Sequence, residues 1–463
     1  MKLRRFLSVF LLLALLTVLF PLTSAYAAED PDIQATAALL VDTATDTVLY
    51  QKDAHQQLSP ASITKIMTVL LVLEDIDRGH LKMDQSVTAS TSALAGLPSD
   101  GSNADPAIVA GETMTVEDLL YCTMVVSANE ACNILAEAVA GSVSDFVEQM
   151  NQRAQQLGCE DTHFTNTNGY TDPNHYTTAW DIYLITREAM KFDDFNYIAS
   201  ATWKNIAPTN MCERQRQLHT TNSLLDGWRY SGYQYSAAQG IKTGTTEAAG
   251  HCLVADAAKN GRQLLSVVMG AQTDTDENGG QRIMSFTETV RLFEWGFENF
   301  STRTVLTADK IIAEVPVELS KETNYVVVHP AYNADAVLPK DIDANLDGDT
   351  LDNDLTYTVD LPEFVNAPIT AGDALGTITV SYHGNTYVTV PLLAVSDVSA
   401  SNFLVGKAAL KNFFSRAIVK IGLVLLILLV AGGVFLLKAT RDRRRYGSQK
   451  KGFRHRSYRG RRF

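Results

Sequence analysis

The chain has few cysteines and no cysteine motif. Its 463 residues include five cysteines, and none of them forms a C-x-x-C pair or a His/Cys cluster. An odd number of irregularly spaced cysteines excludes a disulfide framework, and without clustered ligands the sequence predicts no metal site and no cofactor. We therefore predict that the cysteines are mostly small buried residues. They are Cys122, Cys132, Cys159, Cys212 and Cys252.

Positive charge is scarce in the central part of the chain. The net charge is −13, and removing the +3 of residues 1–27 and the +11 of residues 438–463 leaves −27 on residues 28–437. A segment this acidic repels the phosphate backbone of nucleic acids. The sequence therefore predicts no nucleic-acid partner for the central part.

Two long apolar runs lie at the ends of the chain. Residues 6–20 follow three basic residues and precede the small-residue site Ala25-Tyr26-Ala27, which is typical of a secretory signal peptide. We predict a signal peptide over 1–27 and a mature chain that begins near Ala28. An uncleaved signal anchor is the alternative, but the run is short for a membrane span.

The second apolar run predicts a transmembrane helix over 417–437. The tail that follows, 438–463, contains twelve Lys or Arg residues, and the positive-inside rule places such a tail in the cytoplasm. We predict a single-pass protein of the cell membrane with its ectodomain, the bulk of the chain, on the extracytoplasmic side. Nucleic-acid binding by the tail is the alternative to this topological role.

The region between the two apolar runs divides into two domains that differ in sequence pattern. Residues 30–300 mix strand-like runs, such as 37–41 and 264–269, with helical stretches, such as 116–140. Residues 304–395 contain short β-branched strands and predict a small all-β domain, with one hairpin around Gly384-Asn385. Residues 396–416 form a connector, which is either an amphipathic segment on the membrane surface or a plain linker.

An acidic segment in the β domain matches part of a calcium-loop pattern. It runs from Asp343 to Asp354, where Asp replaces the usual final Glu and no amphipathic helix precedes it. The sequence therefore favours an acidic turn between strands over a calcium site.

Three short motifs occur in one order along the larger domain. They are Ser62-Ile63-Thr64-Lys65, then Ser127-Ala128-Asn129, then Lys242-Thr243-Gly244. Each is common alone, but the ordered set is rare by chance and is typical of the active site of penicillin-recognising serine acyl-transferases.

The first motif supplies a nucleophile and a base. Ser59 is predicted to cap a helix and Pro60 to occupy its first turn, which puts Ser62 at the helix N-terminus, where an anionic intermediate is favoured. Lys65, one turn later, shares the face of Ser62. A buried lysine with a lowered pKa can deprotonate a serine hydroxyl.

The third motif is suited to binding the substrate. Gly244 lets a peptide backbone approach and pair as an added strand, while Lys242 and Thr243 are predicted to hold a terminal carboxylate. By contrast, His175 lies among hydroxyl residues and is predicted to have a structural hydrogen-bonding role.

The chain resembles the D-alanyl-D-alanine carboxypeptidases, the low-molecular-weight penicillin-binding proteins of peptidase family S11. The likeness runs from about Ala37 to Arg416. The chain differs from many members of the family in its transmembrane anchor and basic tail. It is carried by residues 58–68, 111–120, 127–131, 175–179 with Asp181, and 240–246 with Ala249, Gly250 and Cys252.

The resemblance implies a fold, a reaction and roles for the motif residues. The fold is an α/β penicillin-binding (serine β-lactamase-like) catalytic domain followed by a small all-β domain and a C-terminal transmembrane helix. A peptidoglycan stem peptide ending in D-Ala-D-Ala acylates Ser62, D-alanine leaves, and water hydrolyses the acyl-enzyme. β-Lactams acylate the same serine. Ser127 relays a proton, Asn129 binds substrate backbone, and the N–H groups of Ser62 and Thr245 form the oxyanion hole.

Two other functions fit parts of this pattern. A β-lactamase needs a carboxylate that activates the deacylating water, and no E-x-x-L-N signature lies between the second and third motifs. An inert wall-binding scaffold has no need of the intact motifs. The sequence leaves open whether the enzyme also acts as an endopeptidase on crosslinked stems.

Overall fold

A computed structural model describes residues 30–275, 279–340, 355–382 and 385–447. The predicted signal peptide, the acidic segment 343–354 and the end of the basic tail lie outside these residues. The chain divides into two compact units. Among the described residues, the first unit contains 30–303 and 335–340, and the second contains 304–334 and the residues from 355 onward.

The first unit is built on a five-stranded antiparallel sheet. Its strand order is β2-β1-β9-β8-β7, so the edge strand β7 carries the third motif. Every residue of β1 is buried, which is typical of a strand covered on both faces. The strands are β1 (Ala37–Asp42), β2 (Thr47–Lys52), β7 (Lys242–Thr246), β8 (Gly250–Lys259) and β9 (Arg262–Ala271).

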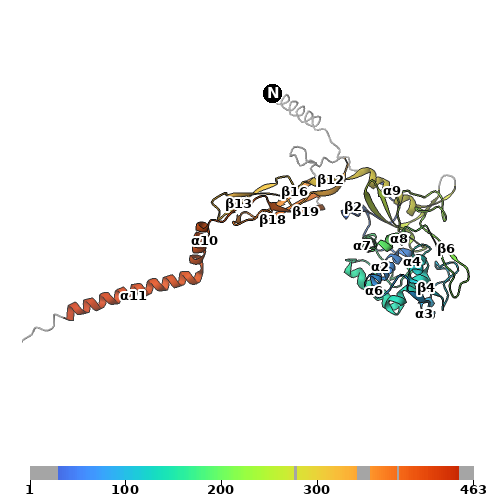
Figure 1. The fold of residues 1–463 in the computed structure, drawn as a ribbon, viewed down its shortest axis with the longest axis horizontal. Helices are drawn as coiled ribbons and strands as arrows, with labels where there is room; N and C mark the ends of the chain where they lie inside the picture. Colours follow the sequence, from blue (N-terminus) through green and yellow to red (C-terminus); the bar gives the residue numbers. More distant parts are fainter. Residues whose placement is uncertain (1–29, 276–278, 341–354, 383–384, 448–463) are drawn as a thin grey trace, which may run out of the picture. The chain divides into compact units, whose positions relative to one another are not determined.

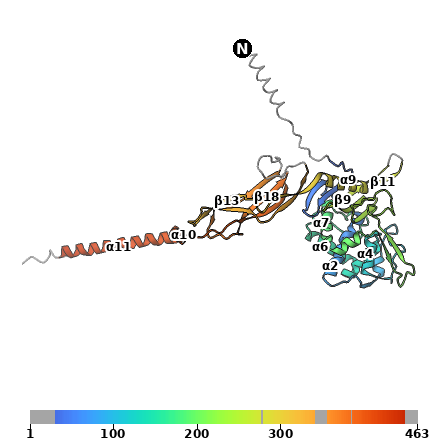
Figure 2. The ribbon, with the colours of Figure 1, turned by 45° about the horizontal axis from the view of Figure 1, so that its top comes forward.

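Helices cover both faces of this sheet and form two hydrophobic cores. The long helix α9 (Met284–Asn299) packs on β8 and β9, and the remaining helices cluster on the other face, as Figures 1 and 2 show. The predicted strands at 37–41 and 264–269 are confirmed. The remaining helical elements are η1 (Ala61–Thr64), α2 (Lys65–Asp77), α3 (Thr91–Leu94), α4 (Val116–Met124), α5 (Asn129–Ala140), α6 (Val143–Gln156), α7 (Ala179–Ala189) and α8 (Asp193–Ala199).

The rest of the first unit consists of short two-stranded ladders. They pair β3 (Ser86–Thr88) with β4 (Thr113–Thr115), β5 (Trp203–Ile206) with β6 (Arg216–His219), and β10 (Thr273–Thr275) with β11 (Gln281–Ile283).

Two local predictions in this unit were wrong. The helical stretch 116–140 is divided into α4 and α5, because Ser127 adopts a left-handed conformation with φ 63°, which no helix can contain. Ser59 does not cap the helix of the first motif. Instead, Pro60 holds the cap position, and a 3₁₀ turn at 61–64 precedes α2.

The second unit contains a six-stranded sheet with the order β16-β18-β19-β14-β13-β17. β18 and β19 pair from Tyr382 opposite Asn385 outward, so the predicted hairpin is confirmed. The strands of this sheet are β13 (Ala313–Glu318), β14 (Tyr325–Pro330), β16 (Leu355–Asp360), β17 (Val365–Asn366), β18 (Ala374–Tyr382) and β19 (Asn385–Ala394). A separate ladder pairs β12 (Phe300–Leu306) with β15 (Ala334–Pro339), and most residues of these two strands belong to the first unit.

Two helices follow the β domain. The connector contains helix α10 (Asn402–Ser415), which buries none of its residues and leaves Phe403, Leu410 and Phe413 exposed. In α11 (Ala417–Gly447), the candidate span Ala417–Arg443 contains an 18-residue window with a mean hydropathy of 2.7, and that window is unburied. By length and composition α11 is able to cross a membrane.

Candidate active site

The turn that carries Ser62 is held from two sides. The Thr64 hydroxyl donates to the Ala61 carbonyl over 2.9 Å, and a Cβ added at Gly169 would stand only 1.8 Å from that carbonyl oxygen. From β7, a Cβ added at Gly244 would lie 2.9 Å from the Ser62 backbone nitrogen. Glycine at both positions lets these segments pack directly against the turn.

The Lys65 ammonium group lies at the centre of the site. It donates to Ser62 Oγ over 2.9 Å, to Asn129 Oδ1 over 2.8 Å and to the Asn168 carbonyl over 2.7 Å. The residue is completely buried. Burial lowers the pKa of Lys65 to about 8. A substantial fraction of Lys65 is therefore neutral near physiological pH.

Ser127 and Asn129 lie where α4 ends and α5 begins. The left-handed conformation at Ser127 turns the chain back, and the Asn129 N–H donates to the Ser102 carbonyl over 2.8 Å. Ser127 is 4 % exposed, yet its Oγ has no hydrogen-bond partner among the described residues. Such a buried hydroxyl is expected to bind a ligand or solvent.

The third motif lines the site from β7. Lys242 is buried, and its Nζ donates to the Thr243 carbonyl over 2.9 Å. Burial, reinforced by the nearby positive charge of Lys65, lowers the pKa of Lys242 well below its usual value. The hydroxyls of Thr243 and Thr221 lie 2.6 Å apart, and the Thr245 hydroxyl lies 3.1 Å from His251 Nδ1.

Two cavities meet at Ser62 and form one cleft with two lobes. They share Ser62, Ser102 and Thr245. One lobe, of about 570 Å³, extends past Asn129, and the other, of about 250 Å³, extends past Ser127, Thr243 and Gly244. Six of the predicted site residues line this cleft, namely Ser62, Ser127, Asn129, Thr243, Gly244 and Thr245. The two lysines contact lining residues, because Lys65 donates to Ser62 and Asn129 and Lys242 donates to the Thr243 carbonyl.

Comparison with known proteins identifies the family. Residues 24–273, more than half of the chain, match the family described as D-alanyl-D-alanine carboxypeptidase, peptidase S11. The chain belongs to this family. Residues 300–400 match the C-terminal domain of penicillin-binding protein 5. The predicted penicillin-binding catalytic domain and the all-β domain that follows it are confirmed.

Relatives of this carboxypeptidase cover most of both domains. The carboxypeptidase DacF of Bacillus subtilis (strain 168) is 29 % identical over 371 residues, which are 80 % of this chain and 87 % of the relative. DacC of Escherichia coli (strain K12) is 30 % identical over 389 residues, 82 % and 89 % of the two chains. The crystal structure of penicillin-binding protein 5 from Haemophilus influenzae has a TM-score of 0.60 and 28 % identity, and the match covers 80 % of this chain and 99 % of that one.

Some residues of this carboxypeptidase site could not be found from motifs. The Asn168 carbonyl is a backbone acceptor that any residue type supplies. Arg229 and Thr221 line the smaller lobe from a loop with no recognisable pattern. His175, by contrast, has the predicted structural role, because it hydrogen-bonds to Thr64 and Thr165 and burial lowers its pKa to about 4.

All five cysteines are buried, as predicted, and all five are free. Burial raises the pKa of Cys122, Cys132, Cys159 and Cys252, so these thiols resist ionisation. Among the described residues, no group of three or more His, Cys, Asp or Glu side chains is placed to hold a metal ion.

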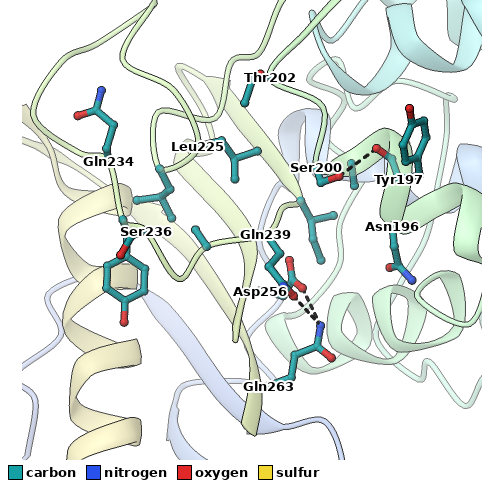
Figure 3. Close-up of a pocket in the computed structure, with 15 residues that line it drawn as sticks. Asn196, Tyr197, Ser200, Thr202, Leu225, Gln234, Ser236, Gln239, Asp256 and Gln263 are labelled. Atoms are coloured by element: carbon teal, nitrogen blue, oxygen red, sulfur yellow. Dashed lines mark hydrogen bonds between the residues drawn. The ribbon is translucent and has the colours of Figure 1, made fainter. Parts of the chain in front are cut away.

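A separate cavity of about 990 Å³ lies near the beginning of β7, among residues of α8, β8 and β9 (Figure 3). At its wall, Gln263 Nε2 donates to Asp256 Oδ2 over 2.8 Å and to Gln239 Oε1 over 3.4 Å. Asp256 is 5 % exposed, and burial raises its pKa to about 6. None of the predicted site residues lines this cavity.

We expect Asp256→Asn to stabilise the protein at neutral pH. The pKa of an aspartate in the unfolded chain is about 3.9, whereas the pKa of Asp256 in the folded protein is about 6. The free energy of unfolding is therefore greatest below about pH 4 and falls as the pH rises through 6. Removing the charge should therefore add roughly 2–3 kcal/mol at pH 7 and nothing at pH 4. Urea unfolding at both pH values measures this. The control variant Asp84→Asn, at an exposed position, should leave the free energy of unfolding unchanged at both pH values. An equal gain for Asp256→Asn at both pH values would contradict the raised pKa of Asp256.

Proposed function

We propose that this enzyme removes the terminal D-alanine from peptidoglycan stem pentapeptides through an acyl-enzyme on Ser62, and that β-lactams acylate the same serine. The observation that carries the proposal is the 2.9 Å hydrogen bond between Lys65 Nζ and Ser62 Oγ, made by a buried lysine whose pKa is about 8. A neutral amine at this distance is able to accept the serine proton.

In the acylation step, Lys65 takes the proton from Ser62, and Oγ attacks the carbonyl carbon of the penultimate D-alanine. The negative charge on the carbonyl oxygen is stabilised by the N–H groups of Ser62 and Thr245. The close approach of β7 at Gly244 to the Ser62 nitrogen supports this pairing.

Collapse of the tetrahedral intermediate breaks the peptide bond, and the leaving nitrogen needs a proton. Ser127 relays that proton from Lys65, a role that its unpartnered, buried hydroxyl supports. Asn129 steadies Lys65 through Oδ1 and binds the substrate backbone through its amide nitrogen. Water then gives a proton to Lys65 and attacks the ester carbon. The bond from that carbon to Ser62 Oγ breaks, the shortened peptide leaves with a new carboxylate, and Ser62 Oγ regains its proton from Lys65.

A single experiment tests the proposal. The full-length protein in detergent is incubated with a stem pentapeptide, and free D-alanine is measured with time. We expect one D-alanine for each peptide and a tetrapeptide as the other product. Failure to release D-alanine from an intact pentapeptide would refute the proposed reaction.

Lys242 and Thr243 are proposed to hold the terminal carboxylate of the substrate. Lys242→Ala should therefore lower kcat/KM for the pentapeptide by about 10²-fold, the typical cost of an unpaired buried charge contact. Replacing the carboxylate of the peptide by an amide should harm the wild type far more than the variant. Equal losses in the two proteins would show that Lys242 does not bind the carboxylate.

We further propose that α11 crosses the cytoplasmic membrane once, with the catalytic domain outside and the basic tail inside. Its apolar stretch and the Arg-rich tail support this topology. We expect the full-length protein to stay in the membrane fraction through high salt, which releases only electrostatically bound proteins.

External protease on wall-stripped cells tests the orientation. It should digest the catalytic domain and spare a tag placed after Phe463. Digestion of the tag on intact cells, or extraction of the whole protein by salt, would contradict a spanning helix.

A further inference from the structure

The two lobes of the cleft differ in charge. Among the described residues, the larger lobe is lined by two carboxylates, Asp100 and Glu247, and by no Lys, Arg or His side chain. The smaller lobe is lined by Arg229 and His251, and by no Asp or Glu side chain that the structure describes. Ser62 lies between them, so the cleft has an acidic end and a basic end on either side of the reacting atom.

Two buried polar side chains show that the cleft is built to hold a ligand. Ser127 Oγ, in the basic lobe, has no hydrogen-bond partner among the described residues. In the acidic lobe, Asn129 is 4 % exposed, and its Oδ1 accepts from Lys65. Its amide nitrogen lies 2.7 Å from where a Cβ at Gly101 would stand, on the wall of the same lobe. This N–H group is free for a peptide carbonyl in the part of the chain that the structure describes.

The direction of the bound peptide follows from these charges. The leaving D-alanine carries the terminal carboxylate, which is attracted to Arg229 in the basic lobe. The acyl part then extends past Asn129 into the acidic lobe. Tyr170 donates a hydrogen bond to Asp100 Oδ1 over 3.3 Å, which orients that carboxylate at the wall.

We propose that Asp100 and Glu247 form a subsite for a primary ammonium group on the acyl-donor peptide, carried by the residue before D-Ala-D-Ala. This inference rests on the proposed function of Ser62. A free amine is protonated at neutral pH and is attracted by two carboxylates, whereas an acylated amine is neutral. The enzyme therefore selects stems whose amine has not been converted to an amide by crosslinking.

Matched peptides test the subsite. They are Nα-acetyl-L-Lys-D-Ala-D-Ala, with a free ε-amine, and its Nε-acetylated form. D-Alanine release by the full-length protein gives kcat/KM for each at low ionic strength. We expect a preference of roughly five- to tenfold for the free amine, since each exposed ion pair contributes modestly. At about 0.5 M salt the ratio should fall toward one.

The variants assign the preference to the two carboxylates. Asp100→Asn with Glu247→Gln should bring the ratio of the two kcat/KM values close to one at low salt. Glu160→Gln, an exposed carboxylate that lines neither lobe, should keep the wild-type ratio.

Three results would overturn the proposal. Equal release from both peptides by the wild type, or an unchanged ratio in the double variant, would overturn the subsite and leave the reaction at Ser62 intact. Release from neither peptide would overturn the proposed function and the subsite with it.

Discussion

Ser62→Ala is expected to abolish D-alanine release and β-lactam labelling together. Ser62 Oγ is the atom that forms the covalent bond, and alanine leaves nothing in its place. The loss in kcat should reach at least about 10⁴-fold, the range seen when a nucleophile is removed from a serine hydrolase. Labelling with a fluorescent penicillin, followed by gel electrophoresis, measures one effect, and D-alanine release measures the other.

Ser59→Ala provides the matched control for this variant. Ser59 lies three residues before Ser62 on the same segment, and its side chain neither caps the helix nor lines the cleft. Ser59→Ala should keep both activities. Covalent labelling that persists in Ser62→Ala would mean that another residue is the nucleophile.

The second large effect is expected for Lys65→Ala. The variant removes the base that accepts the Ser62 proton, so acylation should slow by about 10²- to 10⁴-fold. The apolar side chains of α2 still pack in the core, so thermal unfolding of the variant should remain cooperative. Stopped-flow measurement of β-lactam acylation gives the rate. The exposed control Lys82→Ala should acylate at the wild-type rate.

The pH profile of acylation separates a base from a structural lysine. Only the neutral amine accepts a proton, so the wild-type rate should rise with pH and level off above about 8, the pKa of Lys65. Below that value, the rate should fall about tenfold per pH unit as the lysine becomes protonated. The slow residual acylation by Lys65→Ala should not show this dependence on pH. If the acylation rate of the variant still changes near pH 8, a group other than Lys65 is titrating there.

Much of the site was predictable because its first motif is local. Ser62 and Lys65 lie three residues apart, and helical geometry alone brings such side chains onto one face. The prediction survives the change from an α-helical to a 3₁₀ turn at Ser62, since residues three apart face the same side in both. The order of the three motifs then implied that distant segments meet, although spacing says nothing about the distances between them.

The parts that sequence missed depend on backbone geometry and long-range packing. The resemblance implied a proton-relay role for Ser127, but the pattern gave no sign of its left-handed conformation, which divides a stretch that otherwise has a helical pattern. The Asn168 group that accepts from Lys65 is a backbone carbonyl, which every residue type has. Likewise, the opposite charges of Arg229 and Glu247 gain meaning only when the fold brings their loops to one cleft.

Trapping the acyl-enzyme tests the central claim most directly. The full-length protein is mixed with a pentapeptide substrate, quenched with acid after a short interval, digested and analysed by mass spectrometry. We predict that the peptide containing Ser62 gains the mass of the substrate acyl group without its terminal D-alanine, and that a β-lactam modifies the same residue. Turnover with an adduct on any other residue, or turnover in which no covalent adduct forms under conditions that trap the β-lactam, would contradict the account.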